Sequence, residues 1–334
     1  MTMTDLLNTP ILVLVEHQRG DDGAWRLTPA SAQVISLAKE LTGGGVHVVA
    51  LPSTPDAPAL GALGVERILR PRLDDLAPRV SGVVADAVLA CIADDRYGAF
   101  LVPSSYRGRE VASRVAMRLD SGVVADATAL EVEGEALIAT TVALAGTWTN
   151  RIRVEGALPV ATVKTGAHGV VPAATPTAPV IEDVDFEVSP EAGAVEVVSS
   201  TAEGGTGRVS LADADVVVVA GRGTNGDMSV VDALADELGA AVGATRVVAD
   251  EGWAPRNLQI GQTGANISPK LYIGLGVSGA IHHTVGMQSS AHIVAVCDDP
   301  DAPIFEIADF GVVGDLFEVV PQALEAIRAA RGEN

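Results

Sequence analysis

Two arginines stand at the expected ends of strands in the second half of the chain. Arg222 follows an apolar valine run, and Arg246 lies inside or at the end of the predicted strand at residues 242–248. They are two of four cations between residues 210 and 320, a stretch that holds fifteen carboxylates. An open parallel sheet binds ligands at the carboxyl ends of its strands, so two guanidinium groups there favour an anionic ligand. For either arginine alone, pairing with a local carboxylate such as Asp250 is the simpler interpretation.

A glycine-rich turn includes the first of these arginines. Residues 221–226 are Gly-Arg-Gly-Thr-Asn-Gly, which matches the G-x-G-x-x-G pattern of dinucleotide-binding turns. Such a turn presents bare backbone and a helix N-terminus to phosphate groups. The carboxylate that should follow about 20 residues later is displaced, because Thr245 and Arg246 stand there and Asp250 comes late. An NAD site and an ordinary strand-to-helix turn therefore both remain open.

A second turn is better placed to hold a pyrophosphate. It follows the predicted strand Leu271–Leu275 and contains Ser278, Gly279 and Ala280. We expect Ser278 to cap a helix, and the small Gly279 and Ala280 to leave the first amide groups of that helix uncovered. An ordinary capped helix is the alternative.

Polar side chains near these turns are further candidates. The adjacent His282 and His283 lack the i, i+4 spacing of two metal ligands on a helix, so one of them could contact a ligand ring. The alternative for each is a satisfied surface or core histidine. The loop at residues 260–264, Ile-Gly-Gln-Thr-Gly, offers Gln and Thr side chains to ring nitrogens or carbonyls, or is a plain turn. Asp315 is most simply the N-cap of a long helix, and a ribose hydroxyl is its alternative partner.

The elements that must position these residues alternate as in a parallel sheet covered by helices. Residues 123–163 differ, because they form short strand patterns with no long helix between them. We therefore predict an α/β protein with two domains, each a parallel sheet flanked by helices, the N-terminal one with a β extension and the C-terminal one Rossmann-like. The predicted boundaries are residues 1–198, a small, polar, glycine-rich linker at 199–208, and residues 209–334.

Individual elements follow from the same patterns. Strands are expected at residues 11–15, 46–51, 99–103, 216–220, 242–248, 271–275 and 293–296. Helices are expected at residues 29–41, 107–119, 228–238 and 316–330.

Composition and charge exclude several classes of protein. The net charge of −21 on 334 residues argues against a partner such as nucleic acid or anionic lipid. With 48% apolar residues the chain can bury a core, yet no apolar run approaches the roughly 20 residues that insert across a membrane. The start of the chain, with Asp5 and no basic residue before the first apolar run, fits neither a signal nor a transit peptide. Cys91 and Cys297 are too few for a disulfide framework or a structural zinc site, so we expect a cytoplasmic protein with no metal.

Four segments together resemble the C-terminal domain of the electron transfer flavoprotein α subunit. They are VVVVAGRGTNGD, VGATRVVADEGW, IGQTGANISPKLYIGLGVSGAIHHTVGM and DDPDAPIFEIADFGVVGDLFEVVP, within residues 213–321. In the first domain only LVLVEH and the alternation of strands and helices agree with the family. The resemblance implies an electron carrier with no substrate turnover of its own, one FAD per heterodimer, and a β subunit that carries AMP. It also implies electron transfer from acyl-CoA and related dehydrogenases of fatty acid β-oxidation to a quinone oxidoreductase or respiratory chain.

The resemblance further implies which residues bind FAD. Arg246 would lie over the flavin, Thr263 would hydrogen-bond near N5, and His283 would face the O2 edge, where positive charge favours the added electron. The full implied set is Arg222, Thr245, Arg246, Ile260, Gly261, Gln262, Thr263, Ser278, Gly279, Ala280, Ile281, His282, His283, Cys297, Asp315 and Leu316.

Two residues depart from the family pattern. His282 stands where the family commonly has Gln, and Cys297 stands where it has an Asn that touches the adenosine end. We interpret Cys297 as a small buried apolar residue.

Three other functions remain open: an NAD-dependent dehydrogenase that uses residues 221–226, a non-redox nucleotide-binding subunit, and an electron-bifurcating member with a second FAD in the β partner.

Overall fold

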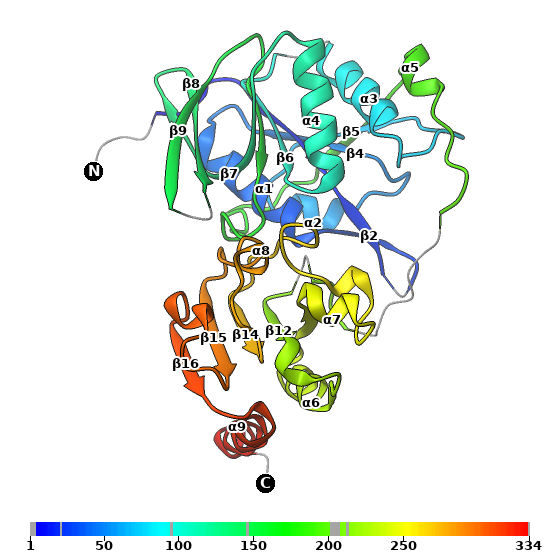
Figure 1. The fold of residues 1–334 in the computed structure, drawn as a ribbon. Coiled ribbons are helices and arrows are strands. Elements are labelled where there is room, and N and C mark those ends of the chain that lie inside the picture. The colour runs from blue at the N-terminus through cyan, green and yellow to red at the C-terminus, as the bar shows by residue number, and fades with distance from the viewer. Residues whose placement is uncertain are drawn as a thin grey trace. The chain divides into compact units, whose positions relative to one another are not determined.

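The chain consists of two compact units, Met1–Ala202 and Glu203–Asn334 (Figure 1). The computed structural model describes residues 5–20, 22–93, 96–144, 147–200, 208–211 and 214–332. Most of the predicted linker, residues 201–207, lies outside the described residues. Its boundaries therefore stay a prediction.

The first unit is an α/β domain with a β extension. In chain order its elements are β1 (Ile11–Val15), β2 (His17–Arg19), β3 (Trp25–Leu27), α1 (Pro29–Leu41), β4 (Val46–Ala50), α2 (Ala57–Ala62), β5 (Arg67–Pro71), α3 (Ser81–Ala93), β6 (Ala99–Pro103), α4 (Tyr106–Arg118), β7 (Val123–Glu133), β8 (Ala136–Ala143), β9 (Trp148–Val154), β10 (Val160–Val163), β11 (Val180–Val184) and α5 (Pro190–Gly193).

Nine of these strands form one sheet in the order β11-β5-β4-β1-β6-β10-β7-β8-β9. The pairs from β11 to β7 are parallel, whereas β7, β8 and β9 form an antiparallel meander. In Figure 1 this meander lies at one edge of the sheet, drawn in green. The predicted β extension is therefore confirmed.

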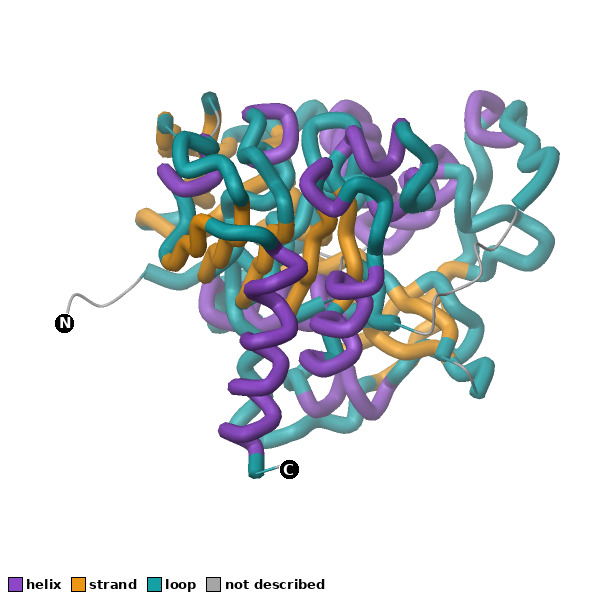
Figure 2. The backbone as a smooth tube through the Cα atoms, turned by 60° about the horizontal axis from the view of Figure 1, so that its bottom comes forward, coloured by secondary structure: helices purple, strands orange, loops and turns teal. Residues whose placement is uncertain are grey.

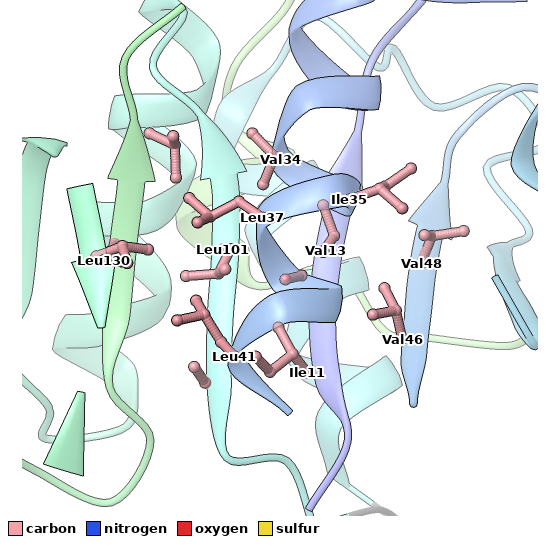
Figure 3. Close-up of a cluster of buried hydrophobic side chains, with 14 of the residues drawn as sticks. Ile11, Val13, Val34, Ile35, Leu37, Leu41, Val46, Val48, Leu101 and Leu130 are labelled. Atoms are coloured by element: carbon pink, nitrogen blue, oxygen red, sulfur yellow. The ribbon is translucent and has the colours of Figure 1, made fainter. Parts of the chain in front are cut away.

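Helices cover both faces of the parallel part, which is why all five residues of β1 are buried. Ile11 and Val13 pack with Val34 and Leu41 of α1 in one cluster, which Figure 3 shows. Leu12 belongs to a second cluster, together with residues of α3 and α4. Two separate apolar layers on one sheet are typical of a doubly wound fold.

The second unit carries the segments of family resemblance. Its elements are β12 (Val216–Ala220), α6 (Ser229–Leu238), β13 (Ala241–Ala244), α7 (Arg246–Asp250), β14 (Leu271–Leu275), α8 (Ile281–Thr284), β15 (His292–Cys297), β16 (Phe310–Val313) and α9 (Leu316–Arg331), the long helix that leads to the C-terminus in Figure 2.

All pairs in its five-stranded sheet are parallel, in the order β13-β12-β14-β15-β16. The chain first moves from β12 to β13 and then returns to the other side of β12 to form β14. Between β12 and β14 the direction of winding therefore reverses, and open α/β sheets bind ligands at such a switch point. The parallel sheet confirms the predicted Rossmann-like class.

The two faces of this sheet are covered differently. Val218 and Ala220 pack in a cluster with residues of α6 and α9. Val217 and Val219 pack on the opposite face against Ile260, Met287 and other residues of irregular segments. Ile260, the first residue of the loop at residues 260–264, is therefore part of the core that supports the sheet.

One predicted strand is wrong. The valines of residues 242–248 suggest a continuous strand, but β13 ends at Ala244 and the next residues form α7. Arg246 is therefore the first residue of a short helix. Arg246 was chosen as a candidate because it was expected near the carboxyl end of a strand. It still lies just beyond the carboxyl end of β13.

Candidate functional site

A pocket of about 300 Å³ lies beyond the carboxyl ends of β12, β13 and β14, at the switch point of the second sheet. It is lined by Arg222, Thr245, Arg246, Val247, Gln259, Ile260, Thr263, Val277, Ser278, Gly279, Ala280, His282 and His283. Ligand pockets span roughly 300–1,000 Å³, so this one suits a single ring system better than a whole dinucleotide.

Ten of the sixteen sequence-predicted residues line this pocket. The other six, Gly261, Gln262, Ile281, Cys297, Asp315 and Leu316, do not. Three lining residues were missed, namely Val247, Gln259 and Val277. The usable signal for Gln259 was its position directly before the loop at residues 260–264, whereas nothing in the sequence distinguishes the two valines from core residues.

The glycine-rich turn after β12 is packed against the turn after β14. The amides of Gly221 and Gly223 donate to the carbonyls of Leu275 (2.8 Å) and Gly276 (3.1 Å). A Cβ on Gly221 would lie 2.1 Å from the Gly276 carbonyl oxygen, so the close contact requires glycine. These two amides are therefore already used within the fold. The first two glycines of the G-x-G-x-x-G match therefore serve the packing between the two loops.

Thr245 places an unsatisfied hydroxyl in the wall of the pocket. It is the N-cap residue of α7, yet its side chain caps no helix amide. Its Oγ1 is buried and has no hydrogen-bond partner among the described residues. A buried unsatisfied hydroxyl is costly, so a ligand that hydrogen-bonds to it gains that energy back.

The cations of the pocket are exposed. The Arg246 Nε lies 3.2 Å from Asp250 Oδ2, and 65% of the Arg246 side chain is exposed. Arg256, which does not line the pocket, also pairs with Asp250, at 2.9 Å. The simpler interpretation of Arg246 as the partner of Asp250 is thus present in the structure. The pair uses one of the five guanidinium donors, which leaves others for a ligand.

The loop at residues 260–264 is held from two sides. The backbone N–H of Gln262 donates to the His282 carbonyl oxygen (2.7 Å). Between the side chains, the His282 ring Nδ1 lies 2.8 Å from Gln262 Oε1. Inside the loop, Gln259 Nε2 donates to Thr263 Oγ1 (2.9 Å), so the Thr263 hydroxyl proton is available to another acceptor. His282 thus helps to fix the loop, and it also lines the pocket.

His283 is a buried, neutral histidine. Its Nδ1 lies 3.1 Å from the Ile260 carbonyl oxygen, which can only accept, so Nδ1 carries the proton. Its Nε2 accepts from the Tyr272 hydroxyl at 2.8 Å. Burial lowers the pKa of His283 to about 4, and burial raises the pKa of Tyr272. His283 is therefore neutral near pH 7 in this structure, and the cations that line the pocket are Arg222 and Arg246.

Ser278 and Asp315 were both predicted to cap a helix, and only Asp315 does so. Ser278 is not a cap, because α8 begins at Ile281 with Ala280 as its N-cap and no side-chain cap bond. The Ser278 carbonyl instead accepts from the Ile304 amide (3.1 Å). Asp315 does cap α9, accepting from the Phe317 amide at 2.8 Å. Cys297 is buried in the apolar cluster that contains Val217 and Val219, which agrees with its interpretation as a small buried apolar residue.

The chemistry of the pocket fits a flavin ring. Val247, Ile260 and Val277 give it apolar walls, and Thr245 and Thr263 give it hydroxyl groups. A planar ring packs its faces against apolar side chains, and the polar atoms along its edges form hydrogen bonds with hydroxyl groups. Elsewhere, no helix in the described ranges is both long and apolar enough to cross a membrane.

Comparisons with known proteins give matches to both units of the chain. Residues 210–288 match the profile of the electron transfer flavoprotein FAD-binding domain, and residues 11–189 match that of the electron transfer flavoprotein domain.

The electron transfer flavoprotein subunit alpha of Mycobacterium tuberculosis (strain ATCC 25618 / H37Rv) is 41% identical over 328 residues, covering 96% of this chain and 99% of that protein. The corresponding Mycobacterium leprae (strain TN) protein is 39% identical over 326 residues, with coverage of 96% and 99%. The "probable electron transfer flavoprotein subunit alpha, mitochondrial" of Caenorhabditis elegans is 34% identical over 328 residues, with coverage of 95% and 93%. With its FAD-binding domain and full-length similarity, the chain belongs to the electron transfer flavoprotein α-subunit family and is an electron carrier.

Proposed function

We propose that this chain pairs with a β subunit and that the heterodimer holds one FAD, bound mainly in the pocket beyond β12, β13 and β14. The observation that carries this proposal is the buried, unpartnered Thr245 hydroxyl in a pocket with apolar walls and two arginines. An NAD-dependent dehydrogenase is no longer an alternative, because the family is one of electron carriers.

The proposed contacts divide between the ring and the tail of FAD. Thr245, Thr263 and Arg246 would hold the ring inside the pocket. Because the pocket is small, the tail would extend along the carboxyl edge of the sheet towards Cys297 and Asp315, which end β15 and precede α9. The Gly314 amide donates to the Cys297 carbonyl (3.0 Å), so these two positions lie on adjoining segments.

The protein's contribution to the chemistry is electrostatic. When bound, FAD supplies one-electron transfer. Arg222 and Arg246 place two positive charges beside the pocket. Neutral His283 adds no charge, and its bond to Ile260 instead fixes one wall. The arginines therefore favour the more negative form of any ligand in the pocket.

The partners and the location of the carrier are also proposals. We place it in the cytoplasm, receiving electrons from acyl-CoA and related dehydrogenases and passing them to a quinone oxidoreductase or respiratory chain. We expect AMP in the β partner. The support is similarity over nearly the full length of the Mycobacterium tuberculosis and Pseudomonas aeruginosa α subunits, at 41% and 34% identity.

Substitution of Thr245 tests the site because it should change the stability of the complex and its FAD affinity in opposite directions. Thr245→Val removes the unsatisfied hydroxyl at nearly constant volume, so the FAD-depleted complex should gain stability, while its FAD affinity falls about fivefold, or ~1 kcal/mol. The measurements are thermal unfolding of the FAD-depleted complex and titration with FAD. Thr245→Ser keeps the hydroxyl and serves as the control. If Thr245→Val binds FAD as tightly as Thr245→Ser, Thr245 does not contact FAD.

A further inference from the structure

The first unit contains a larger pocket that the proposed FAD site does not use. Its volume is about 650 Å³, within the range of small-molecule sites. Val15, Leu51 and Pro71 line it, so it lies beyond the carboxyl ends of β1, β4 and β5.

The sheet topology makes this a place where ligands bind. The chain moves from β1 to β4 and β5 in one direction and then returns to place β6 on the other side of β1. Arg107, from α4 after β6, reaches the same pocket as the residues that follow β1 and β4. The pocket therefore lies at the switch point of the first sheet, as the FAD pocket does in the second.

The lining is positively charged in a strongly acidic chain. Four arginines line the pocket, Arg19, Arg70, Arg72 and Arg107, against two carboxylates, Asp74 and Asp183. His17, also in the lining, is neutral near pH 7, because burial lowers its pKa to about 4. The arginines thus outnumber the carboxylates of the lining, although the whole chain carries −21. Two carboxylates outside the lining, Glu16 and Asp185, pair with Arg107 and Arg72.

Protein contacts hold two of these arginines in place. Arg70 Nε lies 2.6 Å from Asp183 Oδ1, and its Nη1 donates to the Ser53 carbonyl at 2.7 Å. Arg107 Nη2 lies 3.4 Å from Glu16 Oε1. Both side chains are only about 30% exposed, at 30% for Arg70 and 31% for Arg107. Guanidinium groups fixed in this way lose little entropy when an anion binds.

The β2–β3 hairpin supplies the remaining wall. Arg19 stacks on the Trp25 ring, with its guanidinium carbon 4.7 Å from the ring centroid. His17 Nε2 accepts from the Asp56 amide (3.3 Å), so the ring proton is on Nδ1. That Nδ1 is buried and has no partner within the described part of the chain. The wall therefore contains an unsatisfied donor beside an aromatic surface.

We propose that this pocket binds a small anion with a phosphate group, of about the size of a nucleoside monophosphate, and that its arginines bind the phosphate. Arginine is suited to phosphate because its planar donors match the oxygen geometry. The position at a switch point and the volume suit a small ligand, and the four arginines of the lining favour an anionic ligand over a neutral or cationic one.

The test is photolabelling of the purified αβ complex with 8-azidoadenosine 5′-monophosphate, followed by peptide mapping of this chain. Mapping separates this pocket from the AMP expected in the β partner and from the FAD pocket. We expect saturable labelling of peptides that cover residues 17–27 or 70–78. Suppression by inorganic phosphate would show that the phosphate group alone is recognised, and suppression only by AMP would identify a nucleotide. Both results support the proposal.

Two variants make the test specific. Arg19→Gln combined with Arg72→Gln removes two lining guanidinium groups and should raise the half-saturating probe concentration at least tenfold. Arg26→Gln is the matched control, because Arg26 lies on the same hairpin and is exposed but does not line the pocket. It should change that concentration less than twofold.

Three results would overturn the proposal. The first is equal labelling by 8-azidoadenosine, which lacks the phosphate. The second is labelling that is unchanged in the Arg19 and Arg72 double variant. The third is absence of label from the complex, including the case in which the isolated chain is labelled, because the β partner then fills the pocket.

Discussion

At the residue scale, the electrostatic role of Arg246 is the most direct consequence of the proposed site. At ~4 Å and an effective dielectric of ~20, a guanidinium attracts a unit negative charge by about 4 kcal/mol. Because the side chain is 65% exposed, we take roughly a quarter of this, ~1 kcal/mol or about 40 mV for one electron. Arg246→Ala should therefore lower the first one-electron reduction potential of the bound flavin by ~40 mV, with most FAD retained.

The chain offers a matched control for this measurement. Arg256 shares the Asp250 partner with Arg246 but lies outside the pocket lining. Arg256→Ala should leave the potential unchanged, and Arg246→Lys should fall between wild type and Arg246→Ala, because it keeps the charge and loses the planar group. Equal potentials in the Arg246→Ala and Arg256→Ala proteins would show that Arg246 is only a surface partner of Asp250.

His283 predicts how the second unit responds to acid. Its pKa is about 4 when folded, below the ordinary 6.5, so the unfolded chain binds more protons between these values. Stability that is present above pH 6.5 is therefore lost as the pH falls towards 4. From pH 7 to pH 5 the loss is roughly 2 kcal/mol.

Hydrogen exchange of amides in β12 and β14 measures this effect within the second unit and excludes the contribution of His17 in the first. The protection of wild type should fall from pH 7 to pH 5 by more than that of His283→Gln, which cannot titrate. The same fall in both proteins would show that other groups carry the pH dependence.

At the element scale, the turn between β14 and α8 requires glycine at residue 279. Gly279 has φ +82°, and a Cβ there would lie 2.2 Å from the backbone nitrogen of Ile304. Gly279→Ala should move this turn away from the pocket and lower both FAD content and thermal stability, because neither backbone segment can yield cheaply.

Gly239 is the control for this substitution. It ends α6 with φ +62°, and a Cβ added there would meet nothing within 4 Å. Gly239→Ala should cost about 1 kcal/mol of stability through backbone strain and leave the FAD content unchanged. Equal FAD content in the two variants would exclude a role for the Gly279 turn in the site.

How far the sequence predicts the structure also depends on the element. Strands such as β1, β12 and β14 were predicted at their observed bounds, because buried parallel strands are continuous aliphatic runs. The strand expected at residues 242–248 failed at Thr245. A five-residue helix is too short to show a periodic pattern, and valines favour a strand locally.

The pocket could be predicted in position but not in its hydrogen bonds. The ends of β12, β13 and β14 must share one edge of the sheet, which brought Arg222, Thr245 and Ser278 together. The neutral state of His283 follows from its burial, and the orientation of its ring follows from contacts with Tyr272 and Ile260. Such contacts between distant residues depend on the packing of loops, which no local pattern specifies.

At the scale of the whole molecule, the central claim is that an αβ complex carries a single FAD, bound by the second unit of this chain. The direct measurement is the number of FAD and AMP molecules per heterodimer after co-purification with the β partner, denaturation and chromatography. We expect one FAD and one AMP, and a visible flavin spectrum that dithionite bleaches. A complex without FAD would contradict the carrier function proposed here, and two FAD molecules without AMP would contradict the single-flavin assignment in favour of an electron-bifurcating complex.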